Sequence, residues 1–503
     1  MNILIRADAS VDIGSGHVMR CLALAHGLRK ARARVSFVCR QAPGDLCDFI
    51  AAEGYPVQRL PAAEDGVPNP DGETDAAQTI GVMTDAAPLD WLIVDHYALD
   101  RRWESAMRSH TKAIMTIDDL ANRVHDCDIL LDQNYCKGMD TRYDNLTPES
   151  CKRLLGPRFA LLRPEFSDTR PREPRDAPVV RRIFVFLSSA DPFNVTSRVL
   201  DALDTVVSPS VEVDIVAGAA SPHADALASY CSNRPSRRLH VQTAHMAELL
   251  AAADIAIGGG GATSWERACL GVPSLVIGLA DNQIAIAEAL ASAGAQFYLG
   301  RVEDMDDSNL RAALAVLLEN RQLRAALART AFTLTDGGGV GRVICHLLAR
   351  QVSFRPATGD DSDRLFAWRN HPETRRHFFD SAPIDLSAHR RWFADALADD
   401  SRVLLIGTVD GEEAGVLRYD LSGDEARISI YLDPARRGKG IGTMLLVAGR
   451  DWLQSHYPGT QAIVAEALSA NEASIRAFLA AGYRESHRCF RYDIVDDRLT
   501  VPS

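Results

Sequence analysis

Short apolar runs alternate with segments of helical periodicity along the first two thirds of the chain. Before residue 166 the apolar runs predict strands at 3–6, 34–39, 91–94, 113–117 and 129–132. The alternation returns at 183–187, 212–217, 239–242, 255–258 and 274–277, and it closes on a helix that ends near residue 350. Strands separated by helices form parallel sheets. We therefore expect two Rossmann-like domains, residues 1–166 and 179–350, with a ligand-binding crevice at the carboxyl ends of their strands.

A polar stretch joins these two domains, and a different pattern follows them. Residues 167–178 (SDTRPREPRDAP) follow neither the helical nor the strand period, which is typical of a linker. From residue 353 onward the pattern predicts helices at 363–369, 387–398, 440–455 and 471–481, and strands at 403–408, 413–419, 426–432 and 462–467. This order indicates a mixed sheet flanked by helices. The third domain, residues 353–503, is therefore expected to be mixed α/β.

The composition limits which partners the protein is expected to bind and which cellular compartment it is expected to occupy. The 503 residues carry a net charge of −12, which argues against a nucleic-acid partner because phosphate backbones bind basic surfaces. The ten cysteines show no CxxC pair and no regular spacing, as expected of reduced cytosolic thiols. No apolar run approaches the ~20 residues of a membrane-spanning helix, and the chain starts directly in a predicted strand with no signal peptide. We expect a cytoplasmic protein with no membrane partner, and its oligomeric state stays open.

A glycine turn followed by a histidine comes after the first predicted strand. Gly14 and Gly16 allow a sharp turn and a close approach of the backbone to a ligand, and His17 lies where the next helix begins. Met19 occupies the place of the third glycine of a dinucleotide fingerprint, so an NAD site is disfavoured. Imidazole titrates near neutrality, which suits removal of a proton from water. His17 is thus a candidate general base, and the alternative is a histidine that only stabilises the turn.

Carboxylates follow two other predicted strands. Asp95, with His96 and Tyr97, follows the strand at 91–94, and Asp118 and Asp119 follow the strand at 113–117. Parallel strands place these side chains at the crevice, where ligands bind. The alternative for each carboxylate is that it caps the next helix.

The strongest local signal in the second domain is the sequence GGGGATSWE, residues 258–266. It follows a predicted strand and opens a helix, so its backbone N–H groups form a site for a diphosphate. Glu266, one turn into the helix, can accept hydrogen bonds from both hydroxyls of a ribose. The alternative is a flexible turn in which Ser264 and Glu266 cap the helix, but four consecutive glycines cost too much conformational entropy for that to be preferred. The candidate nucleotide ligands are Gly259, Gly260, Gly261, Thr263, Ser264 and Glu266.

Together these motifs resemble a known family, the UDP-2,4-diacetamido-2,4,6-trideoxy-β-L-altropyranose hydrolases of the pseudaminic acid pathway. The similar segments are 6–10 (RADAS), 13–21 (IGSGHVMRC), 94–97 (VDHY), 117–120 (IDDL), 132–134 (DQN), 258–266 and 281–283 (DNQ). The resemblance covers roughly the first 350 residues. It implies a GT-B fold like that of the MurG-type glycosyltransferases, with transfer of the glycosyl group to water.

The resemblance also implies roles for individual residues. His17 would activate water for an inverting attack on the anomeric carbon that expels UDP, and Asp8 would orient His17. Tyr97 and Asn282 match positions that hold the sugar, and no metal is required. Further substrate-binding positions are Gly14, Gly16, Asp95 and Gln283. Residues 188–192 (SSADP) stand where the family carries a glycine-rich turn. The loss of those glycines restricts the backbone at the rim of the crevice, and the exact sugar therefore stays open.

Residues 437–442 (RGKGIG) follow the predicted strand 426–432 and begin a helix. They fit the Arg/Gln-x-x-Gly-x-Gly/Ala pattern of the GCN5-related N-acetyltransferases (GNAT), in which backbone N–H groups hold the pyrophosphate of acetyl-CoA. A chance glycine turn is the alternative, but Phe478 on the last helix and the Gly482-Tyr483 pair after it also match that superfamily. The predicted acetyl-CoA-binding residues are Leu432, Arg437, Gly438, Lys439, Gly440, Ile441, Gly442, Asn471 and Ser474.

Three further positions bear on acetyl transfer. Glu466, near the end of the strand at 462–467, is a candidate base for the incoming amine, and the alternative is an ordinary solvated carboxylate. Many relatives place a tyrosine where this chain has Leu479, so the acid for the departing thiolate is missing or comes from elsewhere, such as Tyr483. Residues 368–370 (WRN) resemble the acceptor side of the nucleotide-sugar-acetylating branch, which makes Arg369 a candidate acceptor ligand.

The sequence therefore predicts a bifunctional enzyme of pseudaminic acid (nonulosonate) biosynthesis. The third domain would acetylate the 4-amine of a UDP-4-amino-4,6-dideoxy sugar with acetyl-CoA, and the first two domains would hydrolyse the product to free sugar and UDP. Two alternatives stay open. The first two domains could be a glycosyltransferase that uses a sugar acceptor, or the third domain could be a non-catalytic acetyl-CoA-binding module.

Overall fold

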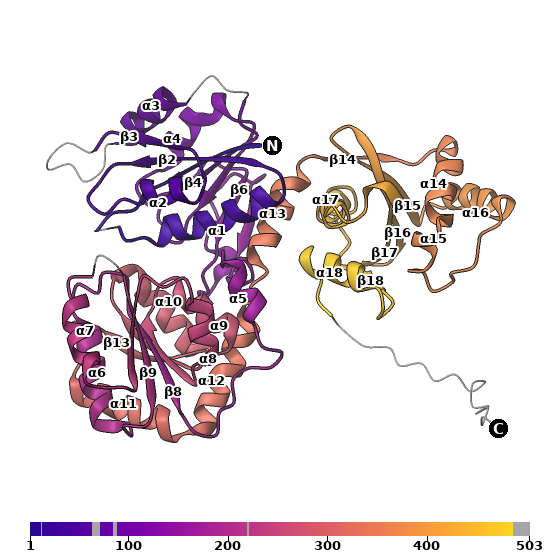
Figure 1. Ribbon diagram of the computed structural model, residues 1–503. Coiled ribbons are helices and arrows are strands. Elements are labelled where there is room, and N and C mark those ends of the chain that lie inside the picture. Colours follow the sequence, from indigo (N-terminus) through magenta and orange to yellow (C-terminus); the bar gives the residue numbers. More distant parts are fainter. Residues whose placement is uncertain (12, 63–70, 84–87, 219–220, 486–503) are drawn as a thin grey trace, which may run out of the picture. The chain divides into compact units, whose positions relative to one another are not determined.

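The computed structural model describes residues 1–11, 13–62, 71–83, 88–218 and 221–485 (Figure 1). By its internal contacts the chain forms two compact units, Met1–Val340 and Gly341–Ser503. The first unit contains two parallel sheets and the second contains one mixed sheet, which confirms the predicted fold class. The predicted domain limits at 166, 179, 350 and 353 stay predictions, and residues 486–503 of the third domain lie outside the described residues.

The first sheet is parallel, with the strand order β3-β2-β1-β4-β5-β6-β7. The order reverses between β1 and β4, which pair in register from Ile3 with Trp91 to Ala7 with Asp95. At such a reversal the connections leave in opposite directions and open a crevice at the carboxyl ends of the strands. The elements are β1 (Asn2–Ala7), α1 (Gly16–Lys30), β2 (Arg34–Arg40), α2 (Cys47–Ala52), β3 (Val57–Leu60), α3 (Gly72–Val82), β4 (Trp91–Asp95), α4 (Arg101–Met107), β5 (Ile114–Ile117), β6 (Ile129–Asp132), β7 (Lys152–Leu155) and α5 (Pro164–Thr169).

The second sheet is also parallel, with the order β10-β9-β8-β11-β12-β13 and a reversal between β8 and β11. Strand β11 leads directly into the glycine-rich turn, which places that turn at the reversal. The elements are β8 (Arg182–Phe186), α6 (Val195–Val206), β9 (Glu212–Ala217), α7 (Ala224–Ser232), β10 (Arg237–Val241), α8 (Met246–Ala252), β11 (Ile255–Gly259), α9 (Thr263–Leu270), β12 (Ser274–Gly278), α10 (Asp281–Ser292), β13 (Phe297–Arg301), α11 (Asp307–Glu319), α12 (Arg321–Leu334) and α13 (Gly339–Ala349).

The segment that follows the first sheet packs into the hydrophobic core of the second sheet. Leu162 and Phe166, which follow the first sheet in the chain, are buried in the cluster that α8 and α9 form over one face of the second sheet. Trp265 of α9 lies in the same cluster, and its indole N–H donates to the side-chain oxygen of Asn134 at 3.1 Å. Buried apolar area and one satisfied buried polar pair therefore hold the two halves together.

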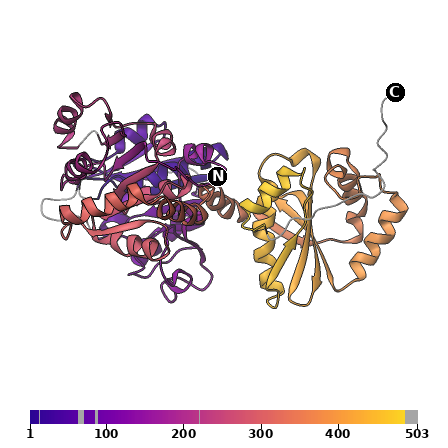
Figure 2. The ribbon, with the colours of Figure 1, turned by 90° about the horizontal axis from the view of Figure 1, so that it is seen from below.

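The third sheet has the order β14-β15-β16-β17-β18, in which the first three pairings are antiparallel and β17 pairs with β18 in parallel. Helices α17 and α18 lie on one side of this sheet and α14 and α16 on the other (Figure 2). The elements are β14 (Val352–Pro356), α14 (Ser362–Asn370), α15 (Pro372–Arg375), α16 (Leu386–Ala398), β15 (Arg402–Val409), β16 (Glu412–Ser422), β17 (Glu425–Leu432), α17 (Ile441–His456), β18 (Ala462–Ala465) and α18 (Glu472–Ala480).

The sequence pattern missed four strands, β3, β7, β13 and β14, and all four lie at sheet edges. Central parallel strands are buried on both faces and form continuous apolar runs, whereas edge strands are short and carry polar residues. The segments KRLL of β7 and VSFRP of β14 illustrate this mixed composition. The predicted linker 167–178 also begins inside α5, because Pro164 at the first helical position favours a short helix there.

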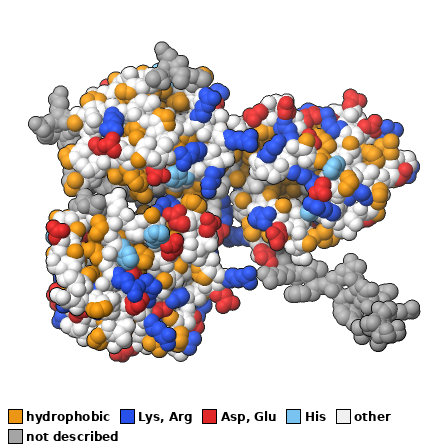
Figure 3. Space-filling view, viewed as in Figure 1, with side chains coloured by type: hydrophobic (Ala, Val, Ile, Leu, Met, Phe, Trp, Pro, Cys, Tyr) orange, Lys and Arg blue, Asp and Glu red, His pale blue; other side chains and the backbone are white. Residues whose placement is uncertain are grey.

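The face of the described residues that Figure 3 draws shows no single dominant character. On the face drawn in Figure 3, acidic, basic and hydrophobic side chains are interspersed. No helix formed by the described residues is both long and apolar enough to span a lipid bilayer.

A buried histidine in the first sheet predicts how stability varies with pH. His125 Nδ1 lies 2.8 Å from Glu104, and Asp118 lies 3.9 Å from its Nε2. Although burial alone would lower it, these two carboxylates raise the pKa of His125 to about 9. A folded-state pKa above the unfolded value of 6.5 adds stability that is complete below pH 6.5 and is lost as the pH rises through about 9.

We therefore expect the thermal midpoint of the wild-type chain to exceed that of His125→Gln most at pH 6, with the difference shrinking towards pH 10. Calorimetry of both proteins over this pH range measures the difference. A constant gap between the two midpoints at all pH values would contradict the assignment.

Candidate functional site

His17 lies in the first turn of α1 and contacts the end of β4. Its Nδ1 is 2.6 Å from Oδ1 of Asp95, and Arg20, one turn further along α1, donates to both oxygens of Asp95 at 2.6 and 2.7 Å. Burial by itself would raise the pKa of Asp95, but Arg20 and His17 hold it well below its usual range. An ionised carboxylate only accepts hydrogen bonds, so the proton of neutral His17 sits on Nδ1 and Nε2 is free to accept one.

Asp8 does not orient His17, and in this respect the sequence prediction was wrong. Both oxygens of Asp8 face a buried network in which Arg6 donates to it at 2.9 Å, the backbone N–H of Arg40 donates at 2.7 Å, and His96 Nε2 lies 3.2 Å away. Asp8 and Asp95 follow neighbouring parallel strands, and only the contacts of their side chains distinguish them. Asp95 is the carboxylate that orients His17.

Tyr97 contacts both His17 and Asn282, which come from different halves of the first unit. The ring of Tyr97 packs edge-on to the imidazole of His17, with 4.5 Å between the ring centres. Its hydroxyl accepts a hydrogen bond of 3.3 Å from the side-chain amide of Asn282, at the start of α10. Burial raises the pKa of Tyr97, so the phenol keeps its proton as a donor. Three predicted site residues therefore form one cluster at the strand ends of the first unit.

The glycine-rich turn between β11 and α9 is tightly packed against its neighbours. A β-carbon at Gly259 would lie 2.6 Å from the carbonyl oxygen of Leu187, and one at Gly260 would lie 3.2 Å from Gln283 Cβ. Gln283 itself accepts hydrogen bonds of 3.2 Å from the backbone N–H groups of Gly260 and Leu279. Gln283 was predicted to bind the substrate. In the structure its side chain instead holds the glycine-rich turn in place.

Arg267, which the sequence prediction missed, organises the hydroxyl groups at the start of α9. It donates to Oγ1 of Thr263 at 3.0 Å, to Oγ of Ser264 at 3.1 Å and to the carbonyl oxygen of Gly259 at 2.9 Å. Burial lowers the pKa of Arg267 to about 10, so it remains a cation near neutrality. Because each hydroxyl oxygen accepts from Arg267, its own proton is left to donate to an anion at the helix N-terminus. The sequence did carry a signal for this role, because Arg267 lies four residues after Thr263 and three after Ser264. Side chains at these spacings are neighbours on the surface of a helix.

Glu266 presents an unpartnered carboxylate oxygen beside this turn. Its Oε2 is buried and has no hydrogen-bond partner among the described residues, and Oε1 lies 3.7 Å from Arg163. Burial raises the pKa of Glu266 to about 7, with Arg163 opposing the shift. A buried acceptor without a donor is unfavourable, so this position suits a ligand that brings hydroxyl donors.

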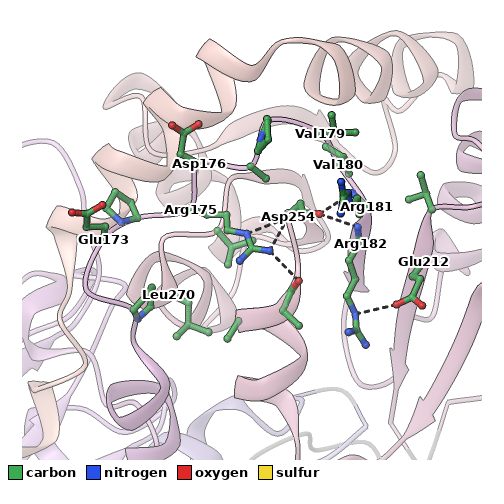
Figure 4. A pocket seen from close by; sticks show the side chains of 18 of the residues that line it. Glu173, Arg175, Asp176, Val179, Val180, Arg181, Arg182, Glu212, Asp254 and Leu270 are labelled. Atoms are coloured by element: carbon green, nitrogen blue, oxygen red, sulfur yellow. Dashed lines mark hydrogen bonds and ion pairs between the residues drawn. The ribbon is translucent and has the colours of Figure 1, made fainter.

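A cavity of about 1300 Å³ lies at the opposite end of the strands of the second sheet, where β8 and β11 begin (Figure 4). Two of its lining arginines are already paired, since Arg175 contacts Asp254 at 2.7 Å and Arg182 contacts Asp214 at 2.6 Å. The predicted site residues lie at the carboxyl ends of the strands instead. The cavity is therefore separate from the candidate site.

In the second unit, the segment RGKGIG forms an open turn at the N-terminus of α17. Gly438 and Gly440 have φ values of 74° and 77°, a left-handed conformation that favours glycine, and no atom lies within 4 Å of their added β-carbons. Arg437, predicted to bind the cofactor, donates to the carbonyl oxygen of Glu373 at 2.6 Å and to Thr374 at 2.7 Å. Arg437 therefore anchors the turn to α15.

Strands β17 and β18 diverge beside this turn. β18 pairs with Glu425–Ile428 of β17, and residues 429–432, which end at Leu432, have no partner on β18. No described strand pairs with these residues on that side, which leaves their backbone groups available to an extended ligand with amide groups. Of the predicted residues on the far side of the gap, Asn471 accepts from the backbone N–H of Ser474 at 3.2 Å and caps α18.

The predicted base and acid of the second unit lie in separate surroundings. Glu466 follows β18 and forms a half-exposed ion pair of 3.1 Å with Arg427. The hydroxyl of Tyr483 is buried without a hydrogen-bond partner in the part of the chain that the structure describes, and its ring packs against Phe478. Leu479 is 42% exposed.

The comparisons with known proteins agree with this division. Residues 351–484 match the family model described as an acetyltransferase (GNAT) domain. The second unit is a GNAT domain. Residues 203–334 match the model described as the C-terminal domain of erythromycin biosynthesis protein CIII-like proteins.

Three relatives are similar to longer stretches of the chain. The spore coat polysaccharide biosynthesis protein SpsG of Bacillus subtilis is 28% identical over 68% of this chain and 96% of its own length. The UDP-2,4-diacetamido-2,4,6-trideoxy-β-L-altropyranose hydrolase of Campylobacter jejuni is 28% identical over 50% of this chain and 81% of its own length. An uncharacterised protein of Methanocaldococcus jannaschii is 22% identical over 97% of this chain and 98% of its own length.

Acetyl-CoA is the cofactor of the GNAT domain, and the described residues fit it. The open turn at Gly438 and Gly440 leaves backbone N–H groups at the start of a long helix for a pyrophosphate. The unpaired edge of β17 offers hydrogen bonds to the amides of the pantetheine arm. Among the described residues, no group of three histidine, cysteine or acidic side chains is placed to hold a metal ion.

The packing of the glycine-rich turn predicts two different responses to alanine. In Gly259→Ala the new β-carbon would clash with the backbone carbonyl of Leu187, which cannot move like a flexible side chain, so we expect a loss of about 1–3 kcal/mol of unfolding free energy. In Gly261→Ala the nearest atom is 3.5 Å away, so the loss should be much smaller. Chemical denaturation of both variants measures the difference. Equal losses would show that packing does not require glycine at 259.

Proposed function

We propose that this chain is a bifunctional nucleotide-sugar enzyme of pseudaminic acid biosynthesis. The first unit hydrolyses UDP-2,4-diacetamido-2,4,6-trideoxy-β-L-altropyranose to the free sugar and UDP. The GNAT domain N-acetylates the 4-amine of the UDP-4-amino-sugar precursor. The observation that carries the proposal is the oriented His17–Asp95 pair, which faces Tyr97 and Asn282 in a unit similar to the Campylobacter jejuni hydrolase.

In the proposed hydrolysis, His17 is the general base. Its Nε2 takes a proton from water, the water oxygen attacks the anomeric carbon, and the bond between that carbon and the β-phosphate oxygen breaks with inversion. UDP leaves with the electron pair of that bond. Asp95 stabilises the imidazolium that forms, as a buried carboxylate does for a catalytic histidine.

The second half of the unit holds the leaving group in this proposal. The N-terminus of α9, with the hydroxyls of Thr263 and Ser264, stabilises the charge that grows on the diphosphate. Glu266 accepts hydrogen bonds from the ribose hydroxyls, which supplies its buried oxygen with the missing donors. Tyr97 and Asn282 hold the sugar next to His17, and Gly14 and Gly16 let the first turn approach it.

In the proposed acetylation, the GNAT domain mainly positions two reactants. Acetyl-CoA supplies the acetyl group as a thioester. The open turn and the unpaired edge of β17 hold it, and a base must remove a proton from the acceptor amine. Glu466 serves as this base through a water, after its exposed ion pair with Arg427 opens.

A product assay tests both activities. The full chain, given acetyl-CoA and the UDP-4-amino sugar, should release CoA, the free diacetamido sugar and UDP. His17→Ala should keep acetylation and lose UDP release by about 10²–10⁴-fold, because a general base contributes that much. Gly440→Glu should lose acetylation, since it places a negative charge in the pyrophosphate turn. Mass spectrometry and phosphorus NMR follow both products.

Two results would contradict parts of this proposal. UDP release that requires an added sugar acceptor would make the first unit a glycosyltransferase. Wild-type chain that binds acetyl-CoA without transferring acetyl groups to amines would make the GNAT domain a binding module, which the leucine at position 479 would then explain.

Glu266 makes UDP affinity depend on pH. Hydroxyl donors of a ribose favour the ionised carboxylate, so binding lowers the pKa of Glu266 from about 7 and releases a proton. The affinity for UDP should therefore fall by up to about tenfold per pH unit below 7 and level off above it. Titration calorimetry of the wild type and Glu266→Gln between pH 5.5 and 8, about one unit either side of that pKa, isolates this residue, because the phosphate of UDP titrates in both. Parallel curves for the two proteins would exclude Glu266 as the ribose ligand.

A further inference from the structure

Asp119, which follows β5 at the carboxyl end of the first sheet, is buried with one of its two oxygens unused. Its side chain is only 10% exposed, and Oδ2 accepts a hydrogen bond of 2.9 Å from Nη1 of Arg20. Oδ1 has no hydrogen-bond partner among the described residues. The preceding Asp118 differs, because it accepts a hydrogen bond of 3.0 Å from the phenol of Tyr143. A buried acceptor without a donor is unfavourable, so Oδ1 of Asp119 suits a ligand that brings a donor.

Arg20 connects Asp119 to the site around His17. The same guanidinium that binds Asp119 donates to both oxygens of Asp95 at 2.6 and 2.7 Å. Its Nη2 also lies 3.3 Å from Nδ1 of His17. A buried arginine that bridges two carboxylates fixes both of them relative to its own planar group. Asp119 is therefore held at a defined position beside the pair that His17 forms with Asp95.

The phenol of Tyr97 provides a donor beside this acceptor. Burial raises the pKa of Tyr97, Asp119 raises it further and Arg20 opposes the shift, so both charged groups lie close enough to act on the phenol. The phenol oxygen accepts from Asn282 at 3.3 Å, and this is its one hydrogen bond within the described ranges. The phenolic proton is still available to a ligand. Tyr97 and Asp119 thus offer one donor and one acceptor next to His17.

A hydroxyl group is the ligand that fits a donor and an acceptor at once. A hydroxyl both donates and accepts, whereas an amide N–H only donates and a carbonyl or ether oxygen only accepts. In the proposed substrate, C1 carries the diphosphate of UDP, C2 and C4 carry acetamido groups, and C6 is a methyl carbon. The hydroxyl at C3 is therefore the one free hydroxyl of the sugar, and the pair of Tyr97 and Asp119 matches it.

We propose that Asp119 is a specificity-determining residue of the first unit, which binds the C3 hydroxyl of the sugar together with Tyr97. This inference rests on the proposed hydrolysis and adds a substrate contact to it. The hydroxyl accepts from the phenol of Tyr97 and donates to Oδ1 of Asp119. Arg20 links this contact to Asp95, so the sugar is held in place relative to His17. A sugar without the hydroxyl leaves two buried polar groups unpaired and is rejected for that reason.

Hydrolysis of the parent UDP-sugar and of its analogue without the C3 hydroxyl tests this contact in the full chain. The wild type should show a kcat/KM about 10- to 100-fold lower for the analogue, as expected from the loss of a hydrogen bond to a charged group. In Asp119→Ala the two substrates should be equal within about twofold, and Asp119→Asn, which keeps an acceptor oxygen, should lie between. A purely structural role would lower both values by the same factor, and that result would overturn the assignment.

Asp126→Ala is the matched control for these measurements. Asp126 pairs with Arg108 at 2.7 Å, in segments that precede β6 and β5, so it resembles Asp119 in having an arginine partner but lies away from the strand ends that carry the site. This variant should discriminate between the two substrates as strongly as the wild type.

A binding measurement needs no turnover and separates this inference from the proposed function. Both UDP-sugars are titrated calorimetrically into the full chain carrying His17→Asn, which removes the proposed base. Tighter binding of the parent sugar that disappears when Asp119→Ala is added supports the contact, even if the first unit proves to be a glycosyltransferase. Equal affinity for the two sugars overturns the contact and leaves Oδ1 of Asp119 to a water. A preference for the parent sugar that survives in Asp119→Ala overturns it as well.

Discussion

The hydrogen bond between His17 and Asp95 is the contact on which the proposed chemistry of the first unit depends. It exists because β1 and β4 are neighbours whose register places Ala7 beside Asp95, so the turn that leaves β1 returns its histidine to the end of β4. Arg20 holds the carboxylate ionised by two hydrogen bonds from the same helix. A slip of one residue between these strands would turn Asp95 to the other face and separate the pair.

The rest of the proposed hydrolytic site comes from the second sheet. Arg267 sets the hydroxyls at the start of α9, and Glu266 leaves a buried oxygen open for a ligand. Trp265, between them in sequence, bonds to Asn134 of the other half. The helix that presents the anion site is therefore fixed to the half that carries His17, which gives the two parts a defined separation within one unit.

In the GNAT domain the features that suit a ligand belong to the backbone, whereas in the first unit they are buried charged side chains. The divergence of β17 from β18 exposes one strand edge, and the left-handed glycines open the turn at α17. Arg437 belongs to the predicted cofactor motif, but its side chain has a structural role, because it holds the turn against α15. On the sheet face that α14 and α16 cover, the buried Nη1 of Arg369 and Nε of Arg418 have no hydrogen-bond partner among the described residues.

The sequence by itself determined the central strands, the fold class and the positions of the glycine turns. These features can be predicted because they are local. A strand buried on both faces is a continuous apolar run, and a glycine turn consists of glycines close together in the sequence. Four of the six edge strands, β3, β7, β13 and β14, were missed because their mixed composition carries no such signal. Only the tertiary structure decided between Asp8 and Asp95, because both lie at strand ends and the contact between Asp95 and His17 joins residues that are 78 positions apart in the chain. It also revealed Arg20 and Arg267, whose roles depend on strand order and side-chain direction, which no local pattern encodes.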